Sequence, residues 1–312
     1  MHKRPAVLVN PPVTLQERYG KLSTAGSSLP PFALMWLASY ARESGFESAI
    51  CDAEALGLTV SETAQSILDM NPWVVGFTAS TLSIAKAAAV AKKIKEARSD
   101  IHTIIGGPHF SATPKKTLEL YPEFDMGCQG EGEETYKEIL QCLEAGGSVS
   151  RVAGTLTRLD GGIYQAPPRA VIDPLDKLPM PAWDLLPDLV KHYQPSALRQ
   201  HRSPASSLVT TRGCFGACTF CDNSVFGQRV RGFSADYVYR MVKHLVDKYG
   251  IRYITFYDDN FAHHKHRLRE LMGLWKANLD VTWSANSRVD VVNQDCLELM
   301  NAAGCWQISW GI

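Results

Sequence analysis

Three cysteines within eight residues constrain this chain more than any other feature of its sequence. Cys214, Cys218 and Cys221 stand at C-x3-C-x2-C spacing, directly after the apolar, β-prone run Ser207–Thr211. Thiolates are soft ligands that suit zinc or an iron–sulfur cluster. A closed zinc site needs four ligands, usually as two close pairs, and the next cysteine after the triad is Cys296. The odd number of thiols therefore favours a four-iron cluster with one iron left open, and a zinc knuckle is the alternative.

The same stretch resembles the radical SAM enzymes, whose mark is this spacing with an aromatic residue, here Phe220, before the last cysteine. The resemblance implies that the three cysteines hold a four-iron four-sulfur cluster, with Phe220 among the cofactor-binding residues. It implies that S-adenosylmethionine chelates the open iron. An electron donor such as flavodoxin or ferredoxin would then reduce the cluster, and cleavage of the sulfonium would give a 5′-deoxyadenosyl radical.

Length and charge narrow the class of protein further. A chain of 312 residues is long enough for two domains, and 32 basic residues balance 32 acidic ones. Because the chain has no excess of positive charge, its composition does not indicate nucleic acid as a partner. The apolar run Ala6–Val9 after the basic Met1–Arg4 is too short for a signal peptide or a membrane span. Eight cysteines in such a chain do not form a disulfide scaffold, which favours a reducing cytoplasm.

Residues 1–145 alternate between short apolar runs and helical patterns. The expected strands are Ala6–Val9, Ser48–Ala53, Trp73–Thr78, Thr103–Ile105 and Asp125–Cys128. The expected helices are Phe32–Ser44, Glu62–Met70, Ile84–Arg98, Thr117–Tyr121 and Glu133–Glu144. Continuously apolar strands separated by helices predict a parallel sheet covered on both faces. We therefore expect a doubly wound, Rossmann-like α/β domain with its ligands at the carboxyl ends of the strands.

Polar and glycine residues follow those strands at the expected ligand edge. Candidate contacts are Asn10, Thr78, Ser80, Thr81, Gly106, Gly107, His109, Gly130, Glu131 and Gly132. Glycines let a flat ligand approach the backbone, and hydroxyls can bind a polar tail. By themselves these residues indicate only a small-molecule site. The order N-P-P, P-P-F-A-L-x-x-L-A, G-G-P-H and G-E-G-E, ahead of the cysteine motif, resembles the cobalamin-binding domain of cobalamin-dependent radical SAM enzymes.

Most of the remaining histidines and cysteines that could bind a metal or a cofactor are interpreted as structural residues. The resembled domains often supply an axial histidine from D-x-H-x-x-G, but here the glycine after His102 comes one residue late. We interpret His102 as an ordinary strand residue and His109 as the better candidate for cofactor contact. A second cluster at Cys51, Cys128 and Cys142 is an alternative, yet these cysteines fall in expected strands and a helix and suit buried packing. His263, His264 and His266 are interpreted as a solvated helix start.

The middle of the chain predicts a connection between domains. Thr155–Leu159 and Ile163–Gln165 flank the turn Asp160-Gly161-Gly162, which predicts a hairpin. A proline-punctuated stretch follows from Leu175 to Pro187. The string L-D-x-L-P-x-P-A-W-D within it also occurs between the two domains of the family that the chain resembles. We place the first domain at 1–145, the hairpin and linker at 146–203, and the second domain at 204–312.

Residues 204–312 resume the alternation of strands and helices, as in the (β/α) partial barrel of radical SAM enzymes. Expected helices are Ala235–Lys248, His266–Leu279 and Asp295–Ala303, and expected strands are Tyr253–Tyr257, Val281–Ala285 and Gln307–Trp310. Candidate contacts to S-adenosylmethionine follow two of these strands: Asp258, Asp259, Asn260, Asn286 and Arg288. A solvated loop and a surface ion pair are the alternatives. Because the second domain has only four expected strands, we expect an incomplete barrel. The apolar residues Trp310 and Ile312 would lie at its uncovered edge, which predicts a shortened chain.

The combined prediction is a cobalamin-dependent radical SAM enzyme acting on a small molecule. The resemblance implies methyl transfer to an unactivated carbon or phosphorus as the commonest outcome. Alternatives are radical ring closure or oxygenation of a tetrapyrrole, a non-catalytic cobalamin or iron–sulfur protein, and a zinc-bound structural module. Substrate identity is not encoded in recognisable residues.

Overall fold

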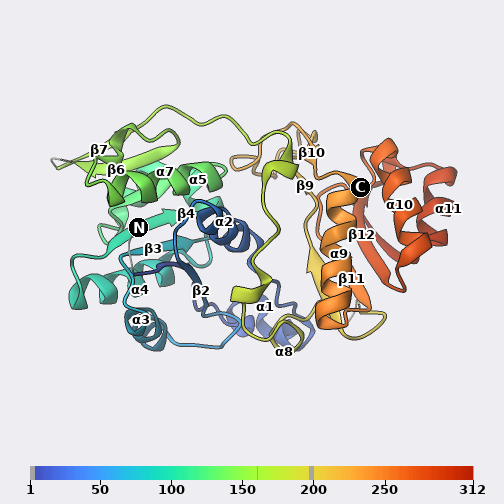
Figure 1. The fold of residues 1–312 in the computed structure, drawn as a ribbon, viewed down its shortest axis with the longest axis horizontal. Coiled ribbons are helices and arrows are strands. Elements are labelled where there is room, and N and C mark those ends of the chain that lie inside the picture. The colour runs from blue at the N-terminus through green and yellow to red at the C-terminus, as the bar shows by residue number, and fades with distance from the viewer. Residues whose placement is uncertain (1–3, 160, 197–199, 312) are drawn as a thin grey trace.

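The computed structural model describes residues 4–159, 161–196 and 200–311, which form two α/β units joined by a long connection (Figure 1). Asp160 and Ile312, named in the sequence predictions, lie outside the described residues. In the described part of the chain, no helix combines the length and apolarity needed to cross a membrane.

The first unit is a seven-stranded sheet of order β2-β1-β3-β4-β5-β6-β7. Its parallel strands are β1 (Ala6–Asn10), β2 (Ser48–Asp52), β3 (Val74–Thr78), β4 (His102–Gly106) and β5 (Met126–Cys128). The hairpin strands β6 (Thr155–Leu159) and β7 (Gly162–Gln165) add to it in antiparallel fashion. The predicted hairpin thus exists, but it extends the first sheet. The predicted domain boundaries stay a prediction.

Helices cover both faces of this sheet, as the continuous apolar strands predict. They are α1 (Leu15–Tyr19), α2 (Phe32–Glu43), α3 (Val60–Asp69), α4 (Ile84–Ala97), α5 (Pro108–Ala112), α6 (Pro114–Leu120) and α7 (Glu133–Glu144). Successive residues of β1 point to opposite faces. Ala6 and Leu8 join a core with α2 and α7, whereas Val7 and Val9 join a second core with α3 and α4. The doubly wound fold is confirmed.

The second unit is a four-stranded parallel sheet of order β13-β12-β11-β8. Its strands are β8 (Ala205–Leu208), β11 (Tyr253–Phe256), β12 (Thr282–Arg288) and β13 (Cys305–Gly311), and its helices are α9 (Ala235–Tyr249), α10 (Lys265–Asn278) and α11 (Gln294–Ala302). The α9 helix begins as expected, because the hydroxyl of Ser234 accepts a hydrogen bond from Tyr237 N at 3.1 Å. Its last turn ends at Gly250 in the left-handed conformation.

A two-stranded antiparallel ribbon projects from this unit. It consists of β9 (Thr211–Arg212) and β10 (Arg231–Gly232), and the intervening residues 213–230 contain the three cysteines of the motif. We call residues 213–230 the cysteine loop. Because Arg212 lies opposite Arg231 in the ribbon, the two ends of the cysteine loop are held side by side.

The two units share one hydrophobic core. The core beneath α2 and α7 continues without interruption into α9 and α10. Trp36 of α2 stacks on Phe233 of the second unit with ring centroids 5.3 Å apart. The connection contributes as well, since Trp183 in a short 3₁₀ turn stacks on His244 of α9 at 5.2 Å, and the short helix α8 (Leu189–His192) follows it. Ala182 N donates to the Met35 carbonyl of α2 at 3.3 Å, so the proline-rich linker is packed against both units.

Candidate functional site

A cavity of about 430 Å³ lies where the two units meet. The first unit lines it with the carboxyl ends of β1, β3, β4 and β5 and with the amino-terminal half of α2. The second unit contributes Val209, Arg212 of the ribbon, and Val225 and Phe226 of the cysteine loop. Ligands of doubly wound sheets bind outside the carboxyl ends of the strands, so the cavity occupies the expected edge.

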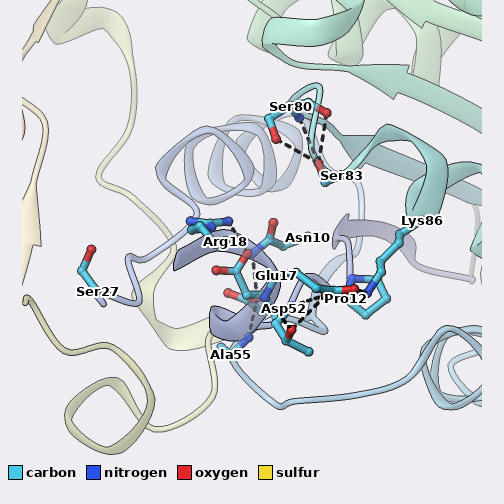
Figure 2. A network of polar contacts seen from close by, with 12 residues as sticks. Asn10, Pro12, Glu17, Arg18, Ser27, Asp52, Ala55, Ser80, Ser83 and Lys86 are labelled. Carbon is cyan, nitrogen blue, oxygen red and sulfur yellow. Dashed lines mark hydrogen bonds and ion pairs between the residues drawn. The ribbon is translucent and has the colours of Figure 1, made fainter. Parts of the chain in front are cut away.

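Most of the predicted contacts of the first unit line this cavity. Those in the wall are Asn10, Thr78, Gly106, Gly107, Gly130, Glu131 and Gly132. Ser80, Thr81 and His109 lie outside the wall. The Ser80 amide donates to Ser83 Oγ at 2.9 Å within a turn (Figure 2), and Thr81 Oγ1 lies 3.1 Å from His109 Nδ1. Their predicted contact with a cofactor stays a prediction.

A glycine at position 107 is needed for the backbone to close this edge. Gly107 has φ +90°, and a β-carbon there would lie 2.6 Å from Thr78 Oγ1 and 2.8 Å from Ala79 N. Residues with side chains rarely adopt this conformation, and the added carbon would also collide with the end of β3. The turn after β4 therefore requires a glycine at position 107 on steric grounds alone, whether or not a ligand approaches the backbone there.

Asn10 is held in the cavity wall by a buried carboxylate (Figure 2). Its Nδ2 donates to Asp52 Oδ1 at 2.8 Å, and Asp52 also accepts from Ala55 N at 3.1 Å and from Tyr193 Oη at 2.8 Å. Burial raises the pKa of Asp52 above its usual range, whereas these hydrogen bonds oppose the shift. The network ties strands β1 and β2 to the connection between the units.

An ion pair that sequence reasoning missed also lines the cavity. Arg18 of α1 lies 2.6 Å from Glu54, which follows β2. Burial raises the pKa of Glu54 to about 7, although Arg18 acts in the opposite direction. The capping-box pattern Thr14-x-x-Glu17 marks the start of α1 and was the available signal for this helix.

Glu131 of the G-E-G-E turn differs from the expectation. Glu131 was predicted to bind a cofactor, but its carboxylate accepts from Arg231 Nη2 at 2.5 Å and from Ile172 N at 2.7 Å. Glu131 is buried, with only 8% of its surface exposed. The carboxylate of Glu131 is thus engaged with the protein, although the residue lines the cavity together with the flanking Gly130 and Gly132.

Two thiols of the cysteine loop, those of Cys214 and Cys218, lie close to Gly216. A β-carbon at Gly216 would lie 3.5 Å from both Cys214 Sγ and Cys218 Sγ, and 3.7 Å from Arg288 Nη1. Cys214 is half-buried, Cys218 and Cys221 are exposed, and none of the three is in a disulfide. The Arg288 guanidinium also lies over the Phe215 ring, 5.4 Å from its centroid. A cationic side chain therefore borders the thiols, although Arg288 also pairs with Asp290 at 2.6 Å, and its predicted contact with S-adenosylmethionine stays a prediction.

The donor set of the cysteine loop fits an iron–sulfur cluster, because a cluster takes one thiolate on each of several irons and the loop carries three thiols. His266 is 89% exposed in its side chain and pairs with Glu270, as expected of a solvated helix start, whereas His263 and His264 are only partly exposed and His263 stacks on Phe215 at 4.8 Å. Cys51 and Cys128 are buried in strands, in keeping with packing roles.

The residues after β11 divide into inward and outward groups. The predicted contact of Asp258 with S-adenosylmethionine does not fit the structure, because its carboxylate accepts from Thr210 N and Thr210 Oγ1, both at 2.5 Å, and from Thr211 N at 2.8 Å. Burial raises its pKa, and neighbouring Arg267 opposes this. Asp258 thus fixes the end of β8 just before the ribbon. Asp259 is exposed, whereas Asn260 is 2% exposed and accepts from Ser287 Oγ at 3.0 Å.

The strand β12 runs farther than its sequence predicts. Asn286 and Arg288 were expected beyond the strand, but they are part of it and pair with Ser309 and Gly311 of β13. Asn286 Nδ2 lies 3.5 Å from the Asp258 carbonyl. Both residues remain at the carboxyl end of the sheet, on the side of the cysteine loop.

Comparison with known proteins agrees with both halves of the site. Residues 21–140 match the B12 binding domain, and residues 208–312 match the Radical SAM superfamily. An uncharacterized methyltransferase of Pyrococcus horikoshii is 35% identical over 92% of this chain and 61% of its own length. The anaerobic magnesium-protoporphyrin IX monomethyl ester cyclase of Rubrivivax gelatinosus is 27% identical over 90% of this chain and 51% of its own length. The chain thus spans roughly half to three-fifths of these relatives.

A solved structure supports the same arrangement of units. The cobalamin-dependent S-adenosylmethionine radical enzyme OxsB, with aqua-cobalamin and S-adenosylmethionine bound, superposes with a TM-score of 0.79 at 20% identity, covering 99% of this chain and 44% of that one. At this identity the likeness shows the fold. The matches to the B12 binding domain and the Radical SAM superfamily over residues 21–140 and 208–312, with the relative that is 35% identical, place this chain in the cobalamin-dependent radical SAM enzyme family.

Proposed function

We propose that this chain binds a four-iron four-sulfur cluster, S-adenosylmethionine and cobalamin, and that it belongs to an enzyme that methylates an unactivated carbon or phosphorus of a small molecule. One observation carries the proposal: the cysteine loop and the carboxyl edge of the doubly wound sheet line the same cavity. Cobalamin in that cavity would face a cofactor held by the cysteine loop. Similarity to the Pyrococcus methyltransferase supports methyl transfer.

The residues of the chain bind and orient, while the cofactors supply the chemistry. Cys214, Cys218 and Cys221 would ligate three irons, with Arg288 beside them to offset the negative charge. S-adenosylmethionine would lie near Phe220, Asp259, Asn260 and Asn286. When bound, the cluster and S-adenosylmethionine supply a 5′-deoxyadenosyl radical, and cobalamin supplies the methyl group. The apolar wall of the cavity, including Trp36 and Phe226, would exclude water from this chemistry.

Cobalamin would be held mainly by the first unit. Contacts are proposed from three sets of residues: Asn10 at β1; Thr78, Ser80 and Thr81 after β3; and Gly106, Gly107, His109, Gly130 and Gly132 after β4 and β5. An external electron donor such as flavodoxin or ferredoxin would reduce the cluster, and the reducing cytoplasm would be its compartment. These assignments follow from the cofactor set that we propose.

The test is cofactor content after anaerobic reconstitution with iron, sulfide and hydroxocobalamin. We expect about four irons and one cobalt per chain, and loss of iron but not of cobalt when the three cysteines are changed to alanine. Iron without cobalt would overturn the assignment of the first unit. Zinc in place of both metals would overturn the whole proposal.

A second candidate, radical ring closure or oxygenation of a tetrapyrrole, is favoured by the similarity to the Rubrivivax cyclase. S-adenosylmethionine with an isotopically labelled methyl group distinguishes the two. Label in the product supports methyl transfer, whereas 5′-deoxyadenosine with unlabelled product supports the second candidate. Absence of 5′-deoxyadenosine under reducing conditions would instead indicate a non-catalytic binding protein.

A further inference from the structure

Two arginines of the ribbon and two glutamates of the G-E-G-E turn form a buried group of four charges between the units. Arg212 Nη2 lies 2.5 Å from Glu133 Oε1, and Arg212 Nη1 lies 3.7 Å from Glu131 Oε1. Arg231 Nη2 lies 2.5 Å from Glu131 Oε1, and Arg231 Nη1 lies 3.2 Å from Glu131 Oε2. Exposure of these four residues is 8% or less. We call them the interdomain quartet.

The quartet joins two segments that matter for the proposed site. Arg212 and Arg231 face each other across the ribbon at the two ends of the cysteine loop, and Cys214 comes two residues after Arg212. Glu131 and Glu133 alternate with Gly130 and Gly132, whose backbone lines the cavity. A displacement of the G-E-G-E turn would therefore be transmitted directly to the cysteine loop.

Further contacts fix the orientation of each arginine: aromatic rings contact Arg212, and a backbone carbonyl contacts Arg231. The Arg212 guanidinium lies 5.3 Å from the ring centroid of Trp36 and 5.4 Å from that of Phe226. Arg231 Nη1 donates to the Ile172 carbonyl at 2.6 Å, and the Ile172 amide donates to Glu131 Oε2. Planar guanidinium groups with two-point contacts fix direction as well as distance, which a lysine would not do.

Stability alone is a poor reason for this arrangement. Removing four charges from water is costly, and well-packed apolar residues often hold an interface equally well. Within the described residues, Glu133 Oε2 and Arg231 Nε are buried without a hydrogen-bond partner, so the group is not fully satisfied. In some proteins, buried polar or charged groups instead select one arrangement among several.

We propose that the interdomain quartet sets the position of the cysteine loop relative to the cavity, with Glu131, Glu133, Arg212 and Arg231 acting as positioning residues. This inference rests on the proposed function, because it gives the quartet the task of holding a cluster at a fixed place opposite cobalamin. It also gives Glu131, which was predicted to contact a ligand, a role in loop placement.

Hydrogen exchange on the cofactor-free chain is the first test, and Glu133→Gln is the variant. We expect amides of residues 209–233 to exchange at least about tenfold faster than in the unaltered chain, while those of α4 and α10 stay unchanged. Glu138→Gln is the matched control, since it breaks the ion pair of the same helix α7 with Arg169, away from the ribbon. An unchanged loop, or faster exchange throughout the chain, would overturn the proposal.

A second variant covers the case in which Glu133→Gln does not fold. Arg212→Lys keeps the buried charge but loses the planar two-point contact. The same acceleration confined to residues 209–233 is expected. Uniform acceleration in this variant as well would assign the quartet to general stability.

Pulsed electron paramagnetic resonance then tests positioning in the loaded protein. The spin–spin distance between cob(II)alamin and the reduced cluster should show one narrow distribution in the unaltered chain and in Glu138→Gln. We expect a broadened distribution in Glu133→Gln with iron and cobalt contents unchanged. An equally narrow distribution there would contradict the proposal. Failure of the unaltered chain to bind both metals would instead contradict the proposed function, and the exchange result would still report on the quartet.

Discussion

At the scale of single residues, Gly213 shows how tightly the cysteine loop is built. It separates Arg212 of the ribbon from Cys214 and has φ +82°. A β-carbon at this position would lie 2.3 Å from the Arg229 carbonyl oxygen, which belongs to the returning end of the loop. The three nearest atoms all belong to the backbone of Arg229 and Gly227, so no flexible side chain could move aside to make room. The first thiol of the motif is therefore placed by a residue without a side chain.

We predict that Gly213→Ala destabilises the folded chain and lowers the iron content after reconstitution. The clash with Arg229 should cost about 1–3 kcal/mol beyond the backbone strain. Gly227→Ala is the control, because Gly227 lies in the same loop with φ +68° and has nothing within 4 Å of an added β-carbon. Denaturant unfolding and iron analysis measure the difference. Equal losses in the two variants would contradict the steric argument.

Single residues were also where sequence reasoning reached its limit. The cysteine spacing and the glycines of the cavity edge could be predicted, because each reflects a local requirement for a ligand type or a backbone conformation. The partners of Asp258 and Glu131 could not, because Thr210, Arg231 and Ile172 are distant in sequence. An acidic residue at the end of a strand has the same local pattern whether it faces a ligand or a buried arginine.

At the scale of elements, the sequence predicted most strands and long helices because apolar periodicity reports burial. The short helices α1 and α5 were missed, since neither is long enough to show a period. The hairpin was predicted, but its pairing with β5 is a long-range contact that no turn signal encodes. The strand β12 was predicted too short, because Asn286, Ser287 and Arg288 are polar residues that continue pairing with β13.

The helix α1 gives a prediction about pH. It lies against the carboxyl edge of the first sheet through Arg18, which pairs with Glu54, and through Glu17, which pairs with Lys86 of α4 (Figure 2). Burial raises the pKa of Glu54 from 4.5 to about 7, so the folded chain binds a proton there that the unfolded chain has lost. Stability from this group is therefore present at low pH and is lost as pH rises through that window.

We predict that Glu54→Gln removes this pH dependence. Relative to the variant, the unaltered chain should lose about 1–3 kcal/mol of unfolding free energy between pH 5 and pH 8, the lower figure allowing for solvent screening. Glu17→Gln is the control, because a hydrogen bond from Lys86 lowers the pKa of Glu17 to about 2. Its difference from the unaltered chain should stay constant over the same range. Denaturant titrations at each pH give these differences, and parallel curves for Glu54→Gln would contradict the prediction.

At the scale of the whole molecule, the continuous core explains why two units can hold one cavity. Independent domains joined by a linker generally move relative to one another unless the interface is large and apolar. Here Trp36 is 3% exposed, stacks on Phe233 and lies under Arg212. Among the described residues, the second core of the first unit, which contains Phe124 and Phe77, includes no residue of the second unit. In the described part of the chain, one core is thus shared by the two units and the other belongs to the first unit alone.

We predict that the shared core makes the unaltered chain unfold in a single calorimetric transition, and that Trp36→Ala splits it in two. Truncating a buried aromatic residue costs about 3–5 kcal/mol, and here the loss falls on the contact between the units. Phe124→Ala is the matched control, because Phe124 is fully buried and packs edge-on against Phe77 at 5.7 Å within the first unit. It should lower the transition temperature by a comparable amount while leaving one transition. If Trp36→Ala also unfolds in one transition, the interface is not what couples the units, and the cavity must be held by the interdomain quartet and the packed linker instead.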